Sequence, residues 1–171
     1  MNYILGIGTN IGNRMENIER CINAINLVPY TDVLMCSGIY ETEPVGYARQ
    51  ENFYNCVLFV NSLLEPNEML GLSLGIEAGF GRIRGIKNGP RILDIDILLA
   101  ENQKVKTKNL IIPHPKIKER RFVLEPLLDI YPDGKAFDFE FKSYISQIEG
   151  KAVKKIKDEV VFDEQELRDN L

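Results

Sequence analysis

The sequence feature that most constrains the fold is the run Ile92–Leu99, in which two aspartates alternate with apolar residues. Because successive side chains of a β-strand point to opposite faces, Asp94 and Asp96 share one face and apolar side chains occupy the other. Two residues along a strand span about 6.6 Å, so the two carboxylates can together hold one or two hard cations such as Mg²⁺. A strand with one solvent-exposed face would show the same pattern, and the neighbouring residues decide between these interpretations.

A basic, glycine-rich segment, Gly81–Pro90, leads directly into this strand. It contains Arg82, Arg84 and Lys87, and Arg91 follows it. One guanidinium group can bind two phosphate oxygens at once, and glycines let a loop close over a ligand. The alternative is a solvent-exposed basic loop. Its position beside the two carboxylates favours a polyphosphate that is bound through metal ions.

Hydrophobic periodicity predicts an α+β fold for the rest of the chain. We expect strands at residues 3–8, 33–40, 54–61 and 92–99, and helices at residues 15–27, 66–79 and about 116–124. Asn13 suits the N-cap of the first helix and Pro66 the first turn of the second, and the third helix should end before Pro126. The order strand, helix, strand, strand, helix, strand is the ferredoxin-like pattern, in which an antiparallel sheet packs two helices on one face.

The length of 171 residues suits a single domain. We expect this domain to span residues 1–150, followed at residues 151–171 by a charged C-terminal extension with no motif that indicates a function. The segment Glu41–Asn52 is longer than a hairpin requires, and it is therefore a candidate functional loop.

The composition argues against several classes of protein. A net charge of -4 and a pI near 5.2 argue against binding nucleic acid by bulk electrostatic attraction. Cys21, Cys36 and Cys56 are widely spaced in apolar segments, which indicates buried, reduced thiols and a cytoplasmic protein. The N-terminus lacks a secretory signal, and no apolar run approaches the roughly 20 residues that span a bilayer, so we expect no membrane association.

Three further motifs bear on a possible site. The run Gly6–Gly12 resembles a dinucleotide-binding fingerprint, but its third glycine comes one residue late and the element order does not fit a Rossmann fold. His114 lies between two prolines and near Arg120, where it could donate to a phosphate, although a lone histidine is more often structural. Thr42–Gly46 and Phe53–Asn55 offer an aromatic ring and polar groups, which suit a flat heterocycle or ordinary packing and turn chemistry.

The run Lys87–Leu98 resembles the signature of the 6-hydroxymethyl-7,8-dihydropterin pyrophosphokinases, a family of folate biosynthesis. The likeness extends to residues 7–10, 42–46, 53–55, 77–84 and 113–127, and so covers nearly the whole chain before the extension. It implies a ferredoxin-like αβα sandwich with a mostly antiparallel central sheet. In this family an open valley binds ATP and the pterin side by side, with two Mg²⁺ ions between them.

The resemblance also implies roles for individual residues. The residues that match catalytic positions, with the two aspartates as metal ligands, are Arg82, Arg91, Asp94 and Asp96. Those that match the ATP site are Glu77, Arg82, Arg84, Arg91, Ile97, His114, Pro115 and Arg120. Those that match the pterin pocket, where two aromatic rings would enclose the bicyclic ring system, are Thr42, Glu43, Val45, Phe53, Asn55 and Phe122.

The implied reaction is attack of the pterin hydroxymethyl oxygen on the β-phosphorus of ATP, with AMP as the leaving group. Positioning and neutralisation of charge would supply most of the catalysis, and no side chain is an obvious general base. We expect a monomer with small-molecule substrates and no nucleic-acid partner. The alternatives are a Mg²⁺-dependent nucleotidyl- or phosphotransferase with another acceptor, and a non-catalytic ferredoxin-like module that binds nucleotides or RNA.

Overall fold

A computed structural model of the chain describes residues 1–44, 49–82, 89–149 and 153–158. Its main sheet has the order β10-β3-β4-β1-β5, and β2 pairs with the other end of β4. The strands are β1 (Asn2–Thr9), β2 (Thr31–Cys36), β3 (Ile39–Thr42), β4 (Phe53–Ser62), β5 (Asp94–Ala100) and β10 (Lys154–Lys157). Every pairing in this sheet is antiparallel, so the expectation of an α+β fold with a mostly antiparallel sheet is confirmed.

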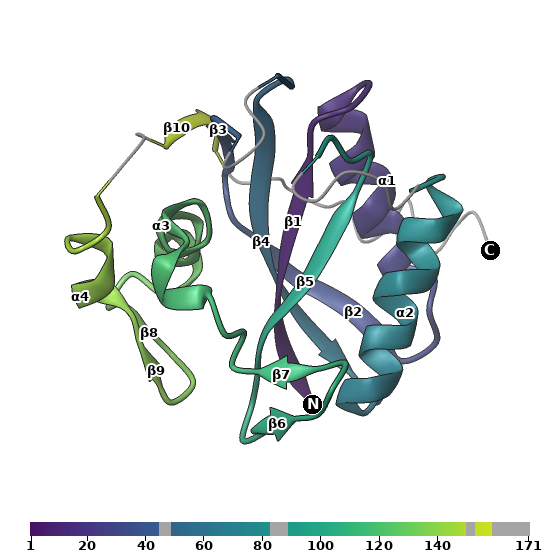
Figure 1. The fold of residues 1–171 in the computed structure, drawn as a ribbon. Coiled ribbons are helices and arrows are strands. Elements are labelled where there is room, and N and C mark those ends of the chain that lie inside the picture. Colours follow the sequence, from purple (N-terminus) through teal and green to yellow (C-terminus); the bar gives the residue numbers. More distant parts are fainter. Residues whose placement is uncertain (45–48, 83–88, 150–152, 159–171) are drawn as a thin grey trace.

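Helices cover both faces of the sheet (Figure 1). The helices α1 (Arg14–Asn26) and α2 (Pro66–Gly79) lie on one face, and α3 (Arg121–Ile130) and the short α4 (Lys142–Ile145) lie on the other. Each face has its own hydrophobic core. The first contains Leu5 and Ile22, and the second contains Ile4 and Leu127. Adjacent residues of β1 therefore point into different cores, as the two-residue period of a strand requires.

The first two helices begin where the sequence predicts. The Oδ1 atom of Asn13 accepts a hydrogen bond of 3.2 Å from the backbone N–H of Glu16 and caps α1. Pro66 occupies the first turn of α2, and Glu65 and Glu68 form a capping box there. Both ends supply partners for backbone N–H groups that a helix leaves unpaired.

The strand expected at residues 33–40 is wrong in one respect, because it is two strands. β2 ends at Cys36 and β3 begins at Ile39. Between them Ser37 donates its N–H to the Val57 carbonyl over 2.9 Å, and its hydroxyl accepts from the Val57 N–H over 2.9 Å. The register against β4 shifts by one residue across this point, so the chain forms a bulge that apolar periodicity does not reveal.

The expected end of the third helix is also wrong. A 3-10 turn (Ile117–Glu119) precedes α3, and α3 continues past Pro126 to Ile130. Proline lacks an N–H and so removes one hydrogen bond within the helix. Pro126 is buried beside the core residues Leu124 and Leu127, and this burial offsets the loss.

Short elements complete the described structure. β6 (Val105–Lys106) pairs with β7 (Ile111–Ile112), and β8 (Lys135–Ala136) pairs with β9 (Phe139–Glu140). Residues 154–157 of the expected C-terminal extension form β10, an added strand of the main sheet. Within the described ranges, no helix is long and apolar enough to cross a membrane.

Candidate active site

The floor of the site is the end of β1 that carries two glycines. β1 lies between β4 and β5, and Gly8 is paired with Asn55 on one side and with Asp94 on the other. A Cβ atom at Gly8 would lie 3.1 Å from Asn55 Oδ1, which is closer than ordinary van der Waals contact. Gly6 is paired with Asp96 in the same way. Gly8 therefore keeps the space beside Asn55 and Asp94 open, a role that the spacing of Gly6–Gly12 did not suggest. A Cβ atom at Gly6 would instead lie 3.2 Å from Leu98 Cδ1.

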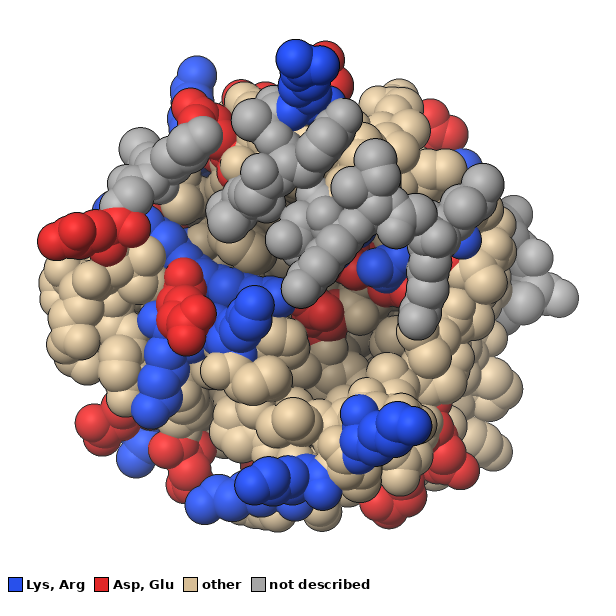
Figure 2. Space-filling model, viewed as in Figure 1, with Lys and Arg blue, Asp and Glu red and all other residues tan. Residues whose placement is uncertain are grey.

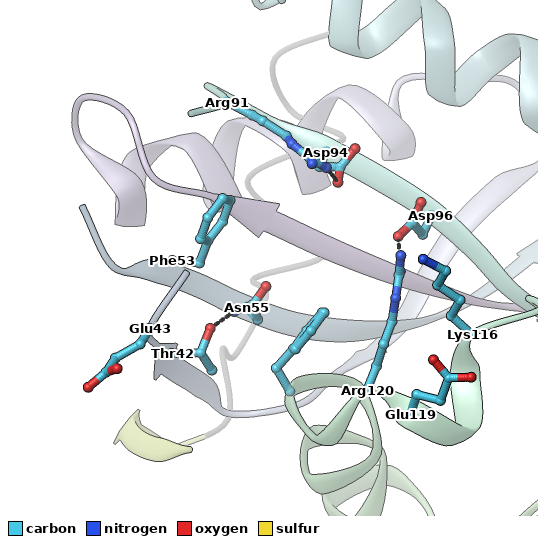
Figure 3. Close-up of a pocket in the computed structure, with 11 residues that line it drawn as sticks. Thr42, Glu43, Phe53, Asn55, Arg91, Asp94, Asp96, Lys116, Glu119 and Arg120 are labelled. Carbon is cyan, nitrogen blue, oxygen red and sulfur yellow. Dashed lines mark hydrogen bonds and ion pairs between the residues drawn. The ribbon is translucent and has the colours of Figure 1, made fainter. Parts of the chain in front are cut away.

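A cavity of about 260 Å³ opens above this floor (Figure 3). Its walls come from β3, β4, β5, the segment that leads into α3 and the first turn of α3. The residues that line it are Thr42, Glu43, Phe53, Asn55, Arg91, Asp94, Asp96, Lys116, Glu119, Arg120 and Phe122. We call it the first cavity. It joins aromatic rings to a group of charged side chains, so one end suits a flat ring and the other an anion.

The aromatic end of the first cavity contains a fixed amide. Asn55 Nδ2 donates a hydrogen bond of 2.7 Å to Thr42 Oγ1, and both side chains are buried. This contact sets the orientation of the amide beside the rings of Phe53 and Phe122. Two rings and an oriented amide match the needs of a flat heterocycle that presents hydrogen-bonding groups at its edge.

The charged end brings three arginines onto two aspartates. Figure 3 shows two of these contacts, Arg91 with Asp94 and Arg120 with Asp96. Arg82 Nη1 lies 2.7 Å from Asp94 Oδ1, and Arg91 pairs with the other oxygen of the same carboxylate. Arg120 pairs with Asp96. In Figure 2 acidic and basic atoms meet around the hollow on this face of the molecule. The three guanidinium groups balance the carboxylates and are placed to bind phosphate oxygens.

A second cavity of about 260 Å³ lies on the other side of Asp96. The residues that line it are Leu70, Ile95, Asp96, Ile97, Lys108, Asn109, Leu110, Ile111, His114 and Pro115. Asp96 lines both cavities, and Arg91 and Asp94 lie on the first. Two ligands bound in the two cavities would therefore meet at the carboxylate pair.

His114 borders the second cavity as a neutral ring with a defined donor. Its Nδ1 atom accepts a hydrogen bond of 3.1 Å from the Lys116 N–H, which leaves the proton of the neutral ring on Nε2. Burial, and then the positive charge of Arg120, lower the pKa of His114 below its ordinary value. His114 is thus suited to donate a hydrogen bond from Nε2 at neutral pH.

Glu77 supports the site from α2. Its Oε1 atom accepts a hydrogen bond of 2.8 Å from the Ile95 N–H and also pairs with Arg82. Burial raises the pKa of the Glu77 carboxyl, although the Ile95 hydrogen bond and the Arg82 charge act in the opposite direction. The carboxylate holds α2 against β5 and orients Arg82 toward Asp94.

Most residues expected from the sequence lie in one of the two cavities or on the charged group between them. The expected pterin residues Thr42, Glu43, Phe53, Asn55 and Phe122 line the first cavity, and Ile97, His114 and Pro115 line the second. Arg82 forms ion pairs with both Glu77 and Asp94, and these contacts place Glu77 and Arg82 next to the charged group. Val45 and Arg84 lie outside the described residues.

Other residues that line the cavities are not predicted from the sequence. Lys116 and Glu119 border the first, and Lys108 and Asn109 border the second. The latter two lie between β6 and β7, strands of two residues each that are too short to leave a periodic signal. Lys116 is close to His114 in sequence, and that proximity is the one signal that could have indicated it.

The donor set of the charged end fits Mg²⁺ bound together with a polyphosphate. Asp94 and Asp96 offer hard carboxylate oxygens on one face of β5. The described residues contain no group of three or more His, Cys, Asp or Glu side chains that could hold a metal ion. Two carboxylates leave most of an octahedral shell to phosphate and water oxygens, which is the way Mg²⁺ is usually bound in such sites.

A carboxylate pair that could hold Mg²⁺, set beside arginines between an aromatic cavity and a second cavity, is typical of enzymes that transfer phosphoryl groups between two small substrates. The comparison with known proteins narrows this class. The chain belongs to the 7,8-dihydro-6-hydroxymethylpterin-pyrophosphokinase family, whose model matches residues 4–132. The family resemblance seen in the sequence is therefore confirmed.

Two relatives illustrate the similarity. The chain is 40% identical over 132 residues to the 2-amino-4-hydroxy-6-hydroxymethyldihydropteridine pyrophosphokinase of Bacillus subtilis, covering 76% of this chain and 79% of that protein. It is 37% identical over 129 residues to the protein of the same name from Methylorubrum extorquens, covering 75% of this chain and 82% of the relative. Both relatives are named as enzymes, which does not favour the non-catalytic binding module.

A solved structure supports the fold alone. The crystal structure of an HPPK-DHPS in complex with substrates superposes with a TM-score of 0.60 at 19% identity. The match covers 85% of this chain, whereas the chain spans only 43% of that protein.

Proposed function

We propose that this chain transfers the pyrophosphoryl group of ATP to the hydroxymethyl group of 6-hydroxymethyl-7,8-dihydropterin, giving AMP and the pterin diphosphate, in folate biosynthesis. The observation that carries the proposal is the position of Asp96, which lines both cavities beside Asp94 and the arginines. Family membership and the names of the relatives support the same reaction.

The first cavity is the proposed pterin site. Phe53 and Phe122 would enclose the bicyclic ring, and Asn55, oriented by Thr42, would bind its polar edge. The sequence resemblance assigns Glu43 and Val45 to the same pocket. The pterin hydroxymethyl group would then point toward the aspartates, because these lie at the charged end of the same cavity.

The second cavity is the proposed nucleotide site. Ile97 and Pro115 offer apolar contact, and His114 offers an Nε2–H donor. The polyphosphate would extend from this cavity across Asp96 toward Arg82, Arg91 and Arg120. The sequence resemblance adds Glu77 and Arg84 to this site, and in our proposal Glu77 acts by orienting Arg82.

The arginines would exchange partners during the reaction. In the described structure Arg82, Arg91 and Arg120 pair with Asp94 and Asp96. When a polyphosphate binds, these guanidinium groups would turn to its oxygens and release the carboxylates to two Mg²⁺ ions. Mg²⁺ would supply neutralisation of phosphate charge and a lower pKa for the attacking hydroxyl.

The bond changes are simple. The hydroxymethyl oxygen forms a bond to the β-phosphorus, the bond from that phosphorus to the α–β bridging oxygen breaks, and AMP leaves with the electron pair. The hydroxyl proton passes to solvent. Arg82 and Arg91 would stabilise the charge that develops on the transferred group.

The overall fold supports the same proposal. The strand order β2/β3, β4, β1, β5, with α1 and α2 on one face, follows the ferredoxin-like order that we propose for this domain. The helix α3 adds the third layer of an αβα sandwich and brings Phe122 and Arg120 to the site. We keep residues 1–150 as the proposed catalytic domain, to whose sheet β10 of the C-terminal extension adds one strand.

We also propose that the chain acts in the cytoplasm as a monomer, with ATP and the pterin as its partners. Cys21, Cys36 and Cys56 are free and buried, and burial raises the pKa of the Cys21 thiol to about 12. Unreactive thiols of this kind suit a reducing compartment. Light scattering of the purified chain at micromolar concentration tests the oligomeric state.

Isotope labelling tests the proposed reaction. With ATP labelled at the γ-phosphate, the label should appear in the pterin product, and with ATP labelled at the α-phosphate it should appear in AMP. Label from the γ-phosphate in free phosphate alone, whether or not the pterin is present, would identify a hydrolase and overturn the proposal. Transfer of the γ-phosphate with release of ADP would identify a simple kinase.

A further inference from the structure

The edge strand beside the proposed pterin site is held by the C-terminal extension. β3 has 4 residues and ends at Thr42, which lines the first cavity. β4 pairs with one edge of β3, and β10 pairs with the other, placing Lys154 opposite Glu41 and Lys155 opposite Tyr40. β10 lies beyond residues 4–132, the part of the chain that the family model matches. Figure 1 shows β10 next to β3 at the edge of the sheet.

The half-buried carboxylate of Asp129 joins three elements at this point. Asp129 of α3 accepts hydrogen bonds from the Gly38 N–H over 2.9 Å and from the Tyr40 hydroxyl over 2.9 Å. Its other oxygen accepts from Lys155 Nζ over 3.1 Å. The same ammonium group lies 5.7 Å from the centre of the Tyr40 ring. α3, the start of β3 and β10 are therefore connected through one side chain.

The absence of a side chain at Gly38 lets β10 approach the start of β3. A Cβ atom at this position would lie 2.7 Å from the Lys157 carbonyl oxygen and would collide with the side chain of Lys155. It would also lie 3.1 Å from Asp129 Oδ2. A residue with a side chain at position 38 would thus have to displace the C-terminal strand.

The connected elements carry opposite walls of the first cavity. Thr42 lies at the end of β3, and Phe122 lies on α3 about two helical turns before Asp129. Thr42 is paired with Phe53 of β4, so the distance between these walls also affects how tightly a flat ring fits between Phe53 and Phe122. The Asp129 contacts limit how far β3 and α3 can move apart.

We propose that β10, through the Lys155–Asp129 ion pair, is a clamp that positions the two walls of the pterin cavity. Lys155 and Asp129 are positioning residues in this proposal, because neither lines the cavity. The effect should fall on binding of the pterin and should leave the ATP side unchanged. This inference rests on the proposed function for its substrate, but the contact that it invokes can be measured without catalysis.

The test compares Lys155→Ala and Gly38→Ala with the matched control Lys154→Ala in the full chain. Lys154 lies on the same strand and is also exposed. Both test variants should raise the KM for the pterin about three- to tenfold and leave the KM for ATP within about twofold, the size expected for loss of a few coupled contacts. Lys155→Arg should restore the pterin KM, and Lys154→Ala should leave it unchanged.

Hydrogen exchange provides a readout that is independent of activity. Amides of residues 39–42 should exchange faster in Lys155→Ala and Gly38→Ala than in the wild type, whereas amides of β1 should not change. Equal exchange and an unchanged pterin KM in both test variants would overturn the clamp. A parallel rise in both KM values would also overturn it, since that result indicates general loss of structure. A wild-type chain that forms no AMP would instead overturn the proposed function, and the exchange rates would still decide whether β10 holds β3.

Discussion

At the scale of single residues, the site depends on the missing side chain of Gly8 as well as on its charged side chains. Gly8 lies between Asn55 and Asp94, and its lack of a side chain leaves room for the Asn55 amide. Asp94 and Asp96 gain their role from neighbours: the same alternation on an exposed strand would be unremarkable, but here three arginines face the pair. The chemistry is therefore set by how neighbouring strands align these residues.

The first prediction concerns Gly8. In Gly8→Ala the new methyl group would crowd Asn55 Oδ1 and turn the amide away from its hydrogen bond with Thr42. We expect the KM for the pterin to rise about tenfold or more, which corresponds to loss of one oriented hydrogen bond. Gly71→Ala is the control, because a Cβ atom there meets nothing within 4 Å. Steady-state kinetics measures both, and an unchanged pterin KM in Gly8→Ala would contradict the proposed pocket.

The second prediction concerns Arg91. Arg91→Ala should lower kcat by about 10²- to 10³-fold, because it removes one donor from the charge that develops on the transferred group. Its partner Asp94 keeps an ion pair with Arg82, so the fold should persist. Arg20→Ala is the control, since Arg20 contacts the Phe80 ring. Equal single-turnover rate constants for Arg91→Ala and the wild type would exclude Arg91 from catalysis.

The third prediction concerns pH and His114. Burial and Arg120 hold the pKa of His114 below its ordinary value of 6.5, so the unfolded chain binds this proton more readily. The contribution of His114 to stability is therefore complete above pH 6.5 and is lost as the pH falls through the lower folded-state pKa. Urea unfolding of the wild type should show a drop in the free energy of unfolding at acid pH that His114→Asn lacks.

A control for this measurement comes from Glu77. The pKa of the Glu77 carboxyl is raised, so the pH dependence of its contribution to stability is opposite to that of His114. The Glu77 contribution is present at low pH and is lost as the pH rises through the folded-state pKa. Both chains contain Glu77, so the difference between wild type and His114→Asn isolates the histidine. A difference that does not vary with pH would show that His114 is not buried as a neutral ring.

At the scale of elements, local patterns predict the helices and strands that have strong signals of their own. The caps at Asn13 and Pro66 and the periodicity of Ile18–Ile25 locate α1 and α2 closely. The break at Ser37 and the passage of α3 through Pro126 depend on hydrogen bonds and packing with distant parts of the chain. Local sequence cannot reveal such contacts, and the same reason explains why β10 was read as a charged extension.

The fourth prediction concerns the N-cap of α1. Asn13→Ala removes the cap of α1 and should lower the free energy of unfolding by about 1 kcal/mol, whereas Asn13→Asp should largely retain it. Neither change should alter KM values, because Asn13 lies outside both cavities. Chemical denaturation and steady-state kinetics measure the two effects, and equal stability of Asn13→Ala and the wild type would refute the role of the cap.

At the scale of the whole molecule, two cavities meet over one strand. β5 contributes Asp94 and Asp96 at the junction, α3 brings aromatic and basic residues to the first cavity, and the β6–β7 segment borders the second. The arrangement explains how a chain with an overall charge of -4 can bind a polyphosphate. The positive charge is local, and it is balanced by the same carboxylates that would bind Mg²⁺.

The most direct test of this account is formation of AMP from ATP and Mg²⁺, with and without 6-hydroxymethyl-7,8-dihydropterin, by the wild type and by Asp96→Ala. Asp133→Ala, altered in the turn before β8, serves as the control for a lost aspartate. We predict AMP that depends on the pterin in the wild type and the control, and its loss in Asp96→Ala. A folded wild-type chain that binds ATP but forms no AMP with the pterin would contradict the account.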